Sequence, residues 1–506
     1  MKYSKVDNTE WSKRQTLKSG MAFFLHFLLL VLITAGVIFY DKLPSFISAI
    51  KANSANYTYM LFCIALFVVI LYFYFYFEDR TMLASGKSIA LIFTILDIYV
   101  AVSCIVGEKV HIFARPVALV ALLVFVLVGR KDAIVMNIMC ALLIFIIDNF
   151  SGRLGATKNE IYSSLIISFS AGMIAIFSVD RAKTRFQIVG VGLLIVLPID
   201  FIIFLLGLCE FMNEGGAAVS ELPVFDTILV NMGYGLCGGV ASAVVFLFVL
   251  PVFEWAFNCL TVFRLRELTS TDAKLLKKLK QEAPGTFNHS MMVAQLAEAC
   301  ATAIGEDVDC ARAAAFYHDV GKLHNPEYFT ENQGDYNLHD ELAPELSADM
   351  IRSHAKDGHK LIRTYHLPQF LADVAEQHHG TLPIRYFYAK ALKMTDGNLN
   401  IEDFSYTGPK PQTKIAAIIM IADASEAAVR ALSKRTPEAA EKVIRDIIEE
   451  RMELEQFADC DITMSDLAKI RQALVSSLTG VYHHRVKYPQ IRYKHKDGKM
   501  TGENYD

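Results

Sequence analysis

The residues best able to do chemistry are histidines and aspartates gathered in one part of the chain. Nine of the 14 histidines fall between residues 289 and 379, and His318 is followed directly by Asp319 in the stretch RAAAFYHDVGKLHNPEYF. Neutral imidazole is the commonest protein ligand for metals, and bridging carboxylates favour hard or borderline cations such as Mn or Fe. The candidate metal ligands are His289, His318, Asp319, His354, His378, His379 and Asp423.

The adjacent pair constrains the number of ions. At 3.6 residues per turn, neighbouring side chains on a helix point about 100 degrees apart, so His318 and Asp319 do not easily address one ion. Two ions resolve this if Asp319 bridges them while His318 binds one, and such a pair activates a water for attack on phosphorus. The alternative that a single histidine of the set is a capping or core residue stays open.

A second His-Asp pair, His339 and Asp340, lies in the polar stretch DYNLHDELAPELSA. This stretch reads as a loop ahead of a helix, with Asp340 as the N-cap. We leave the pair out of the metal set and keep His339 as a candidate for contact with a substrate.

The part of the chain that carries these residues has a helical pattern, and alternating strand patterns are scarce in it. A helical bundle can bring ligands from distant helices to one centre. The expected helices cover 287–304, 309–322, 341–354, 368–379, 413–432 and 437–457.

The preceding part of the chain is apolar. Hydrophobic residues make up 53% of the sequence, with 34 Phe in 506 residues, which exceeds the usual content of a soluble protein. Most of the apolar stretches are near the ~20 residues that a helix needs to cross a bilayer, and the fourth and fifth are short. They are roughly 21–40, 58–77, 89–106, 113–129, 133–148, 161–178, 187–208 and 226–257.

The distribution of Lys and Arg predicts orientation. The N-terminal tail and every second loop after it are basic, which is typical of the cytoplasmic side. An even number of crossings would leave both termini and the polar half in the cytoplasm, so we expect a multi-pass protein of the cell membrane. The predicted all-α architecture has a cytoplasmic tail at 1–20, a transmembrane domain of about eight helices at 21–257, linker helices at 258–284, a metal-binding domain at 285–480 and a polar tail at 481–506.

Charged residues inside the expected spans need a partner or a cavity. Asp97 and Asp200 are two such residues, and Arg115 is a candidate partner for them. A ligand or ion site and a helix-packing ion pair are both open, and the second is the commoner case. The formal net charge of −4 gives no reason to expect binding of a nucleic acid polymer.

Several stretches resemble the HD domain of the seven-transmembrane HD family, the PgpH-type cyclic di-AMP phosphodiesterases. They are EAPGTFNHSMMVAQLAEA, AFYHDVGKLHNPEYFTENQ, HDELAPELSADMIRSHAKDG, EQHHGT and GPKPQTKIAAIIMIADASEA, and the membrane stretches FARPVALVALLVFVLVGRKDAIV and LFVLPVFEWAF are similar to the same family. The resemblance implies a bacterial membrane enzyme that cleaves cyclic di-AMP to 5'-pApA with two divalent ions, Mn or Fe.

Carried over by residue, the resemblance implies one ion on His289, His318, Asp319 and Asp423, and another on Asp319, His354, His378 and His379. Lys322 matches the lysine of the HD-x-G-K turn and is a candidate phosphate contact, the alternative being a solvent-facing lysine. Tyr386, Phe387 and Tyr388 are candidates to stack an adenine, and are equally candidates for the core.

The chain departs from the family between the first two spans. Members carry a large extracytoplasmic domain there, whereas DKLPSFISAIKANSANY fills that place here. Two other functions stay open: an HD nucleotide phosphohydrolase, and a membrane receptor that binds nucleotide without turnover. The choice between cyclic dinucleotides and the formation of a homodimer are also open.

Overall fold

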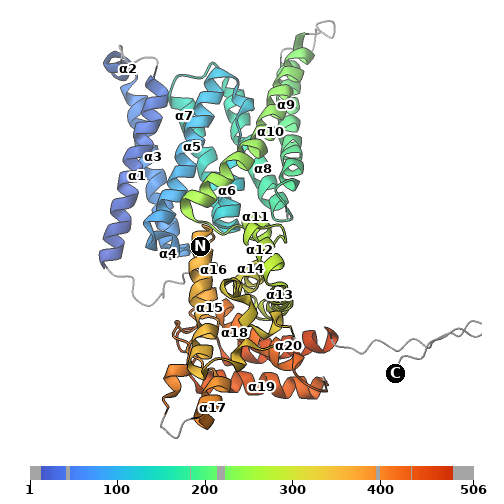
Figure 1. Cartoon of the computed structure of the whole chain (residues 1–506). Coiled ribbons are helices and arrows are strands. Elements are labelled where there is room, and N and C mark those ends of the chain that lie inside the picture. The colour runs from blue at the N-terminus through green and yellow to red at the C-terminus, as the bar shows by residue number, and fades with distance from the viewer. Residues whose placement is uncertain are drawn as a thin grey trace, which may run out of the picture. The chain divides into compact units, whose positions relative to one another are not determined.

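The computed structural model describes residues 13–40, 46–182, 184–213, 223–334, 336–394, 399–434 and 436–481. The chain divides into two compact units, Met1–Glu267 and Leu268–Asp506. The regular elements in the described residues are all helices (Figure 1), with one isolated bridge between Pro383 and Ser405. The predicted all-α fold is confirmed.

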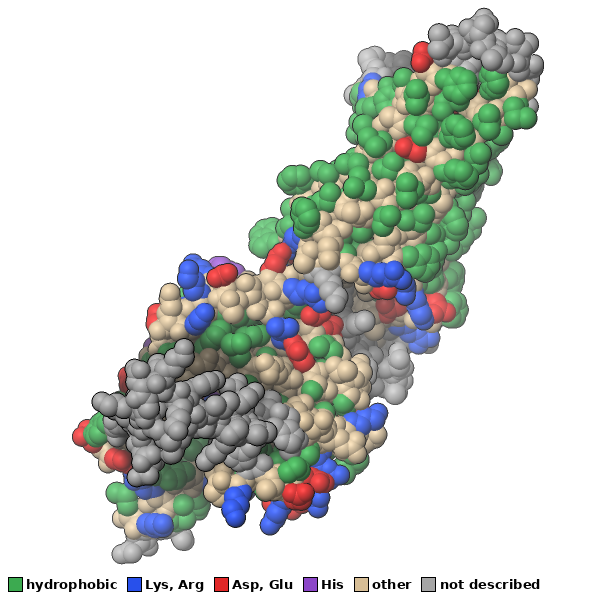
Figure 2. Space-filling model, turned by 90° about the vertical axis from the view of Figure 1, so that its right-hand side faces the viewer, with side chains coloured by type: hydrophobic (Ala, Val, Ile, Leu, Met, Phe, Trp, Pro, Cys, Tyr) green, Lys and Arg blue, Asp and Glu red, His purple; other side chains and the backbone are tan. Residues whose placement is uncertain are grey.

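The first unit contains seven helices that are long and apolar enough to cross a membrane, counted over its described residues. Figure 2 shows hydrophobic side chains over much of the visible face of this unit, as expected of a surface that faces lipid. The long helices are α1 (Lys13–Phe39), α3 (Ser54–Glu78), α5 (Gly86–Lys109), α7 (Arg130–Phe150), α8 (Lys158–Val179), α9 (Gln187–Asn213) and α10 (Pro223–Phe257). The short ones are α2 (Phe46–Ala52), α4 (Arg80–Ala84), η2 (Ile112–Ala114), α6 (Leu119–Leu127) and α11 (Val262–Leu268).

The fourth predicted span is not a full-length helix. It consists of the 3-10 turn η2, the extended residue Arg115 and the nine-residue helix α6. At 1.5 Å per residue α6 is about 14 Å long, roughly half of the ~30 Å hydrocarbon core. Pro116 explains the interruption, because it lacks a backbone N–H and disfavours helical backbone at the residue before it.

The ends of the neighbouring helices show where this segment runs. Arg153, just after α7, contacts Glu108 at the end of α5 at 2.6 Å, so these two helices end on the same side. Tyr74, near the end of α3, donates to Asp132 at the start of α7 over 3.1 Å, on the opposite side. Helices α5 and α7 therefore run in the same direction, and residues 110–129 return across the unit between them. We call residues 110–129 the return segment.

Arg115 fixes the return segment, and its partner is not one of the two predicted aspartates. Its side chain is 1% exposed, and its guanidinium donates to both carboxylate oxygens of Asp148 over 2.6 and 2.8 Å. Its Nε donates to the carbonyl oxygen of Ser103 over 2.9 Å. The bidentate geometry is what a planar guanidinium favours, and Asp148, at the very end of an expected span, was missed as a membrane residue.

Asp97 and Asp200 are separate from this pair. Each has a buried Oδ1 that makes no hydrogen bond within the described residues. Asp200 lies against α10 where Gly235 has no side chain, and a Cβ there would approach its Oδ1 to 2.5 Å. Neither aspartate is part of the helix-packing ion pair that the sequence suggested.

The second unit is a helical domain whose central helices carry most of the candidate ligands. Helix α14 packs against α13, α16 and α18, and α15 packs against α16. Its helices are α12 (Lys274–Glu282), α13 (Pro284–Ile304), α14 (Val308–Tyr317), α15 (Pro344–Thr364), α16 (Gln369–Gln377), α17 (Arg385–Met394), α18 (Lys414–Arg430), α19 (Pro437–Glu453) and α20 (Met464–Val481). The 3-10 turns are η3 (Val320–His324), η4 (Pro326–Tyr328), η5 (Thr330–Asn332), η6 (Leu338–Asp340) and η7 (Ile401–Phe404).

Local sequence sets the bounds of these helices. Helix α14 begins where the Asp307 side chain accepts from the backbone N–H of Cys310 over 3.0 Å, and α18 begins where Thr413 accepts from Ala416 over 3.2 Å. The predicted N-cap role of Asp340 is wrong, since α15 starts at Pro344 and Asp340 ends η6. Proline at the first helical position already has the required φ, which explains the later start.

Candidate metal centre

The structure brings all seven candidate ligands together. His289 comes from α13, His354 from α15 and Asp423 from α18. His318 caps the end of α14, and the adjacent His378 and His379 follow α16. Three helices and two helix ends thus converge on one buried centre, as the bundle argument predicted.

The backbone at the end of α14 explains how the neighbouring residues His318 and Asp319 can both reach the same centre. His318 keeps helical backbone as the C-cap, whereas Asp319 has φ −107° and ψ 12° and leads into η3. The change of backbone redirects the Asp319 carboxylate relative to a continuing helix. His318 and Asp319 therefore both point into the centre.

A glycine contact places Asp319 beside α15. A Cβ on Gly321 would overlap the carbonyl oxygen of His354 and the backbone nitrogen of Gly358. Only a residue without a side chain allows this close approach of the backbones. The glycine of the HD-x-G-K turn thus brings the carboxylate of Asp319 within reach of His354.

The two oxygens of Asp319 face two different sets of ligands. Its Oδ2 lies 3.3 Å from His318 Nε2 and 3.7 Å from His289 Nε2, and His289 Nε2 lies 2.9 Å from Asp423 Oδ1. Its Oδ1 lies 3.3 Å from His354 Nε2 and 3.6 Å from His378 Nε2. We call His289, His318 and Asp423 the first ligand group, and His354, His378 and His379 the second.

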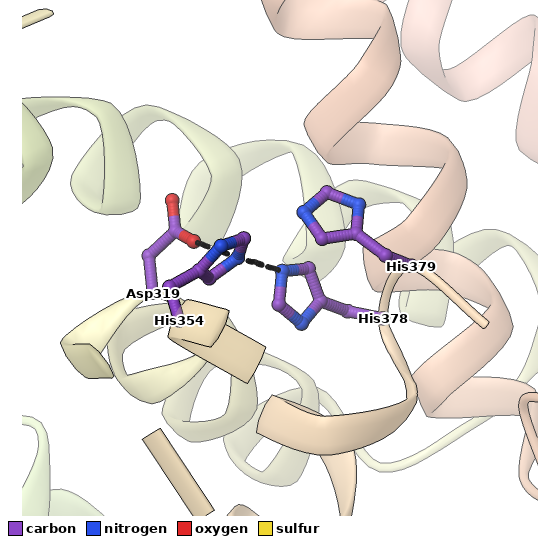
Figure 3. Close-up of side chains that lie close together, drawn as sticks. All are labelled: Asp319, His354, His378 and His379. Carbon is purple, nitrogen blue, oxygen red and sulfur yellow. Dashed lines mark hydrogen bonds and ion pairs between the residues drawn. The ribbon is translucent and has the colours of Figure 1, made fainter. Parts of the chain in front are cut away.

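The second ligand group is compact. Figure 3 shows Asp319, His354 and His378 linked in a row, with the His379 ring next to that of His378. One ligand atom from each of these three histidines and from Asp319 lies within 4.8 Å of the others, a spacing that suits a single ion. The first group meets the same criterion by itself.

Burial and charge give the two groups different electrostatics. Burial lowers the pKa of His289 and His318, but the nearby carboxylates outweigh it and raise them to about 9 and about 10. In the second group burial dominates and lowers the pKa of His378 to about 4. Burial raises the pKa of Asp319, but His318 and Lys322 outweigh it and hold the pKa well below its usual range. An incoming cation therefore competes with protons for His289 and His318, and meets less competition from protons at His378.

The donor set fits divalent cations. His318 Nε2 and Asp319 Oδ1 are buried and make no hydrogen bond within the described part of the chain. Buried polar atoms without a partner are costly unless something else satisfies them. Imidazole and carboxylate donors together suit a divalent cation.

A cavity of about 500 Å³ opens beside the second group. His354 and His379 lie in its wall, and Lys322 lies between the metal ligands and the cavity. Lys322 is not the solvent-facing lysine of the alternative: its side chain is 12% exposed, with Nζ 2.8 Å from both Asp319 Oδ2 and Glu331 Oε1. The other lining residues are Tyr328, Phe329, Thr330, Glu331, Asn337, His339, Ile351, Tyr386, Phe387 and Tyr406.

The three aromatic residues proposed to stack an adenine lie in different surroundings. Tyr386 is 66% exposed and lines the cavity, and Phe387 is buried with one side toward it. Tyr388 packs against Phe404, and its hydroxyl donates to the carbonyl oxygen of Leu399 over 3.3 Å, so it belongs to the core. Residues two apart on a helix point about 200 degrees apart, which accounts for the different surroundings of Tyr386 and Tyr388.

Sequence reasoning missed two residues at the site. Tyr406 stacks on His379 with ring centroids 4.3 Å apart and lines the cavity. Glu426 lies 2.7 Å from His289 Nδ1. No sequence signal marks Tyr406, which comes from a loop, but Glu426 is three residues after Asp423 and so shares its helix face. His339, kept as a candidate substrate contact, also lines the cavity, with Nε2 donating to the carbonyl oxygen of Tyr328 over 2.8 Å.

Two family models match the chain. The model described as 7TM receptor with intracellular HD hydrolase matches residues 54–261, and the HD domain model matches residues 286–428. The first range contains α3, α5, the return segment and α7 to α10, with α1 before it. The family description names seven transmembrane segments. Residues 54–261 contain six of the long helices, so the return segment is needed to reach seven.

Two known proteins are similar to this chain over long stretches. Cyclic-di-AMP phosphodiesterase PgpH of Bacillus subtilis (strain 168) is 36% identical over 448 residues, covering 86% of this chain and 60% of that protein. The protein of the same name from Listeria monocytogenes serotype 1/2a (strain 10403S) is 47% identical over 262 residues, covering 52% of this chain and 36% of that protein. The chain thus spans about three fifths of the length of the first relative and about a third of the second.

A solved structure of the L. monocytogenes PgpH HD domain in complex with cyclic-di-AMP is 49% identical, with a TM-score of 0.41, covering 42% of this chain and 99% of that one. Between the first two long helices of this chain, α1 and α3, lie residues 40–53, the short segment noted in the sequence.

Both family models match in order along one chain. This protein therefore belongs to the family of 7TM receptors with an intracellular HD hydrolase, and is a multi-pass membrane protein whose HD domain lies on the cytoplasmic side.

Proposed function

We propose that the protein is a membrane-anchored, metal-dependent phosphodiesterase that hydrolyses cyclic di-AMP to 5'-pApA. The observation that carries the proposal is the placement of Asp319, whose two oxygens face two ligand groups beside an aromatic-lined cavity. The substrate is suggested by the Bacillus and Listeria relatives, which are cyclic-di-AMP phosphodiesterases by name, since the ligand geometry by itself indicates phosphoester chemistry only.

Two divalent ions, Mn or Fe, would be held by the first and second ligand groups with Asp319 shared. When bound, they supply a nucleophile from water and neutralise charge on the phosphate. Lys322 directs its ammonium group between the ligands and the cavity, where it can pair with a nonbridging phosphate oxygen. Tyr386 and Phe387 offer aromatic surface for an adenine.

The reaction adds one water across one phosphodiester of the cyclic dinucleotide. A P–O bond to one 3' oxygen breaks, the ring opens, and the linear product keeps a 5'-phosphate and gains a 3'-hydroxyl. The size of the cavity, about 500 Å³, lies within the range of small-molecule sites.

The test is a comparison of substrates with the purified full-length chain loaded with Mn or Fe. We expect conversion of cyclic di-AMP to 5'-pApA, measured by chromatography, at a higher rate than phosphate release from AMP. Phosphate release without cleavage of the cyclic compound would support an HD phosphohydrolase instead. Tight binding of cyclic di-AMP without any product would support a receptor.

Lys322→Ala is expected to lower the rate of this hydrolysis by about 100-fold, the typical loss when one donor to a charged transition state is removed. Metal content should remain at the wild-type level, because a lysine ammonium is not a metal ligand. Elemental analysis together with steady-state rates checks both points. Lys414→Ala is the matched control: Lys414 is 16% exposed and pairs with Asp466 at the same 2.8 Å, away from the ligands. A loss of metal in Lys322→Ala would contradict the assigned role.

A further inference from the structure

The hydrogen-bond partners at Nδ1 differ among the candidate histidine ligands. His318, His354 and His378 each place Nδ1 2.6 to 2.8 Å from the carbonyl oxygen of the residue three positions earlier. These contacts leave Nε2 of each ring toward the centre. His289 does not follow this pattern, since its Nδ1 lies 2.7 Å from Glu426 Oε2.

Glu426 reaches His289 from the helix that also supplies a ligand. It is three residues after Asp423 in α18, so one turn of this helix presents both carboxylates to the same side. Asp423 Oδ1 lies 2.9 Å from His289 Nε2, so the imidazole is held between the two carboxylates. The position of this ring therefore depends on α18 at both of its nitrogens.

The carboxylate of Glu426 is buried, with 2% of the residue exposed. A buried carboxylate is costly unless it is paired and hydrogen-bonded. Its Oε2 faces His289, and its Oε1 lies 3.6 Å from Nη1 of Arg430 one turn further along α18. Glu426 does not line the cavity described above, and its carboxylate is directed at His289.

A carboxylate and a peptide carbonyl have different effects on metal binding when they accept a hydrogen bond from Nδ1 of a ligating histidine. Both accept from Nδ1–H and hold the tautomer that leaves Nε2 as the donor to a metal. The carboxylate adds a full negative charge, which makes the imidazole a stronger ligand, and loss of such a partner typically weakens metal binding 10- to 100-fold. Of the four histidines described above, His289 has the anionic partner, and it belongs to the first ligand group.

We propose that Glu426 is a positioning residue that sets the metal affinity of the first ligand group and leaves that of the second group unchanged. The inference rests on the proposed two-metal centre. It adds that the affinity for one ion depends on a carboxylate that hydrogen-bonds to a ligating histidine, whereas the affinity for the other does not. Helix α18 carries this carboxylate.

The test is a titration of the metal-free full-length protein with Mn²⁺, following free Mn²⁺ by electron paramagnetic resonance. The wild type should bind two equivalents. Glu426→Gln keeps the size and removes the charge, so one equivalent should bind about 10- to 100-fold more weakly while the other is unchanged. Added Mn²⁺ should then restore hydrolysis by this variant, which damage to the fold would not allow.

Asp466→Asn is the control, because Asp466 is another buried carboxylate of this domain and pairs with Lys414; its substitution should leave both metal affinities unchanged. Glu426→Asp keeps the charge and should recover part of the lost affinity; it carries the test if Glu426→Gln fails to fold by circular dichroism. Equal weakening of both ions, or of neither, overturns the proposal for Glu426 alone. A wild-type protein that binds no metal overturns the two-metal centre as well.

Discussion

Asp319→Ala is expected to remove both metal ions and to lower hydrolysis by at least about 1000-fold. Each oxygen of this carboxylate faces one ligand group, at 3.3 Å from His318 and 3.3 Å from His354, so this one side chain serves both groups. Loss of metal assistance costs several kcal/mol of transition-state stabilisation, and each 1.36 kcal/mol is a factor of ten in rate. Elemental analysis of the purified variant and a product assay measure the two effects.

The sequence contains its own control for this experiment. Asp340 follows His339 in a second His-Asp pair, but its side chain is 66% exposed and lies outside both ligand groups. Asp340→Ala should therefore keep both ions and a rate within about twofold of the wild type, in line with the small effects of most exposed substitutions. An Asp319→Ala protein that still held two ions per chain would refute the bridging role.

The second large effect is expected on stability and concerns the membrane unit. Arg115→Ala should destabilise the folded protein by about 3–5 kcal/mol, the usual cost of removing one partner of a buried ion pair. The reason is that Asp148 would then be left buried without its bidentate partner. Denaturant unfolding of the full-length protein in detergent measures the change.

Two further variants separate the charge from the general effect of substitution. Replacing Arg115 and Asp148 together by Met and Leu removes both charges and should cost less than Arg115→Ala alone. Arg130→Ala breaks the exposed pair with Asp180, in which both side chains are about half exposed, and should cost at most about 1 kcal/mol. A loss in Arg115→Ala no greater than that in Arg130→Ala would show that the buried pair does not stabilise the fold.

The sequence predicted the helical fold and the seven side chains that the structure brings together, because both depend on residue type and helical periodicity. His289 and Asp423 lie 134 positions apart, yet each is a residue of a metal-binding type on a helix whose buried residues are mostly apolar. What could not be predicted is the environment of each side chain. Tyr386 and Tyr388 look alike in sequence, but only the rotation of α17 sends one to the cavity and the other to the core.

The membrane pairing was harder to predict for a related reason. Arg115 and Asp148 are joined through a segment whose helix is interrupted, so periodicity gives no guide to the direction of the arginine side chain. Asp148 also stands at the end of its apolar stretch, where a carboxylate can be expected to reach water. Its burial depends on neighbouring helices, which hydropathy along one stretch does not describe.

The bond between Arg115 and Asp148 has a consequence for the order of assembly during synthesis. Asp148 follows Arg115 by 33 residues, so the arginine leaves the ribosome well before the carboxylate that neutralises it. An unpaired arginine within a membrane is costly, and the bidentate bond to Asp148 can remove this cost only after α7 has been made. We therefore expect the return segment to take its final place together with α7, so that for this part of the protein the order of membrane integration differs from the order of translation.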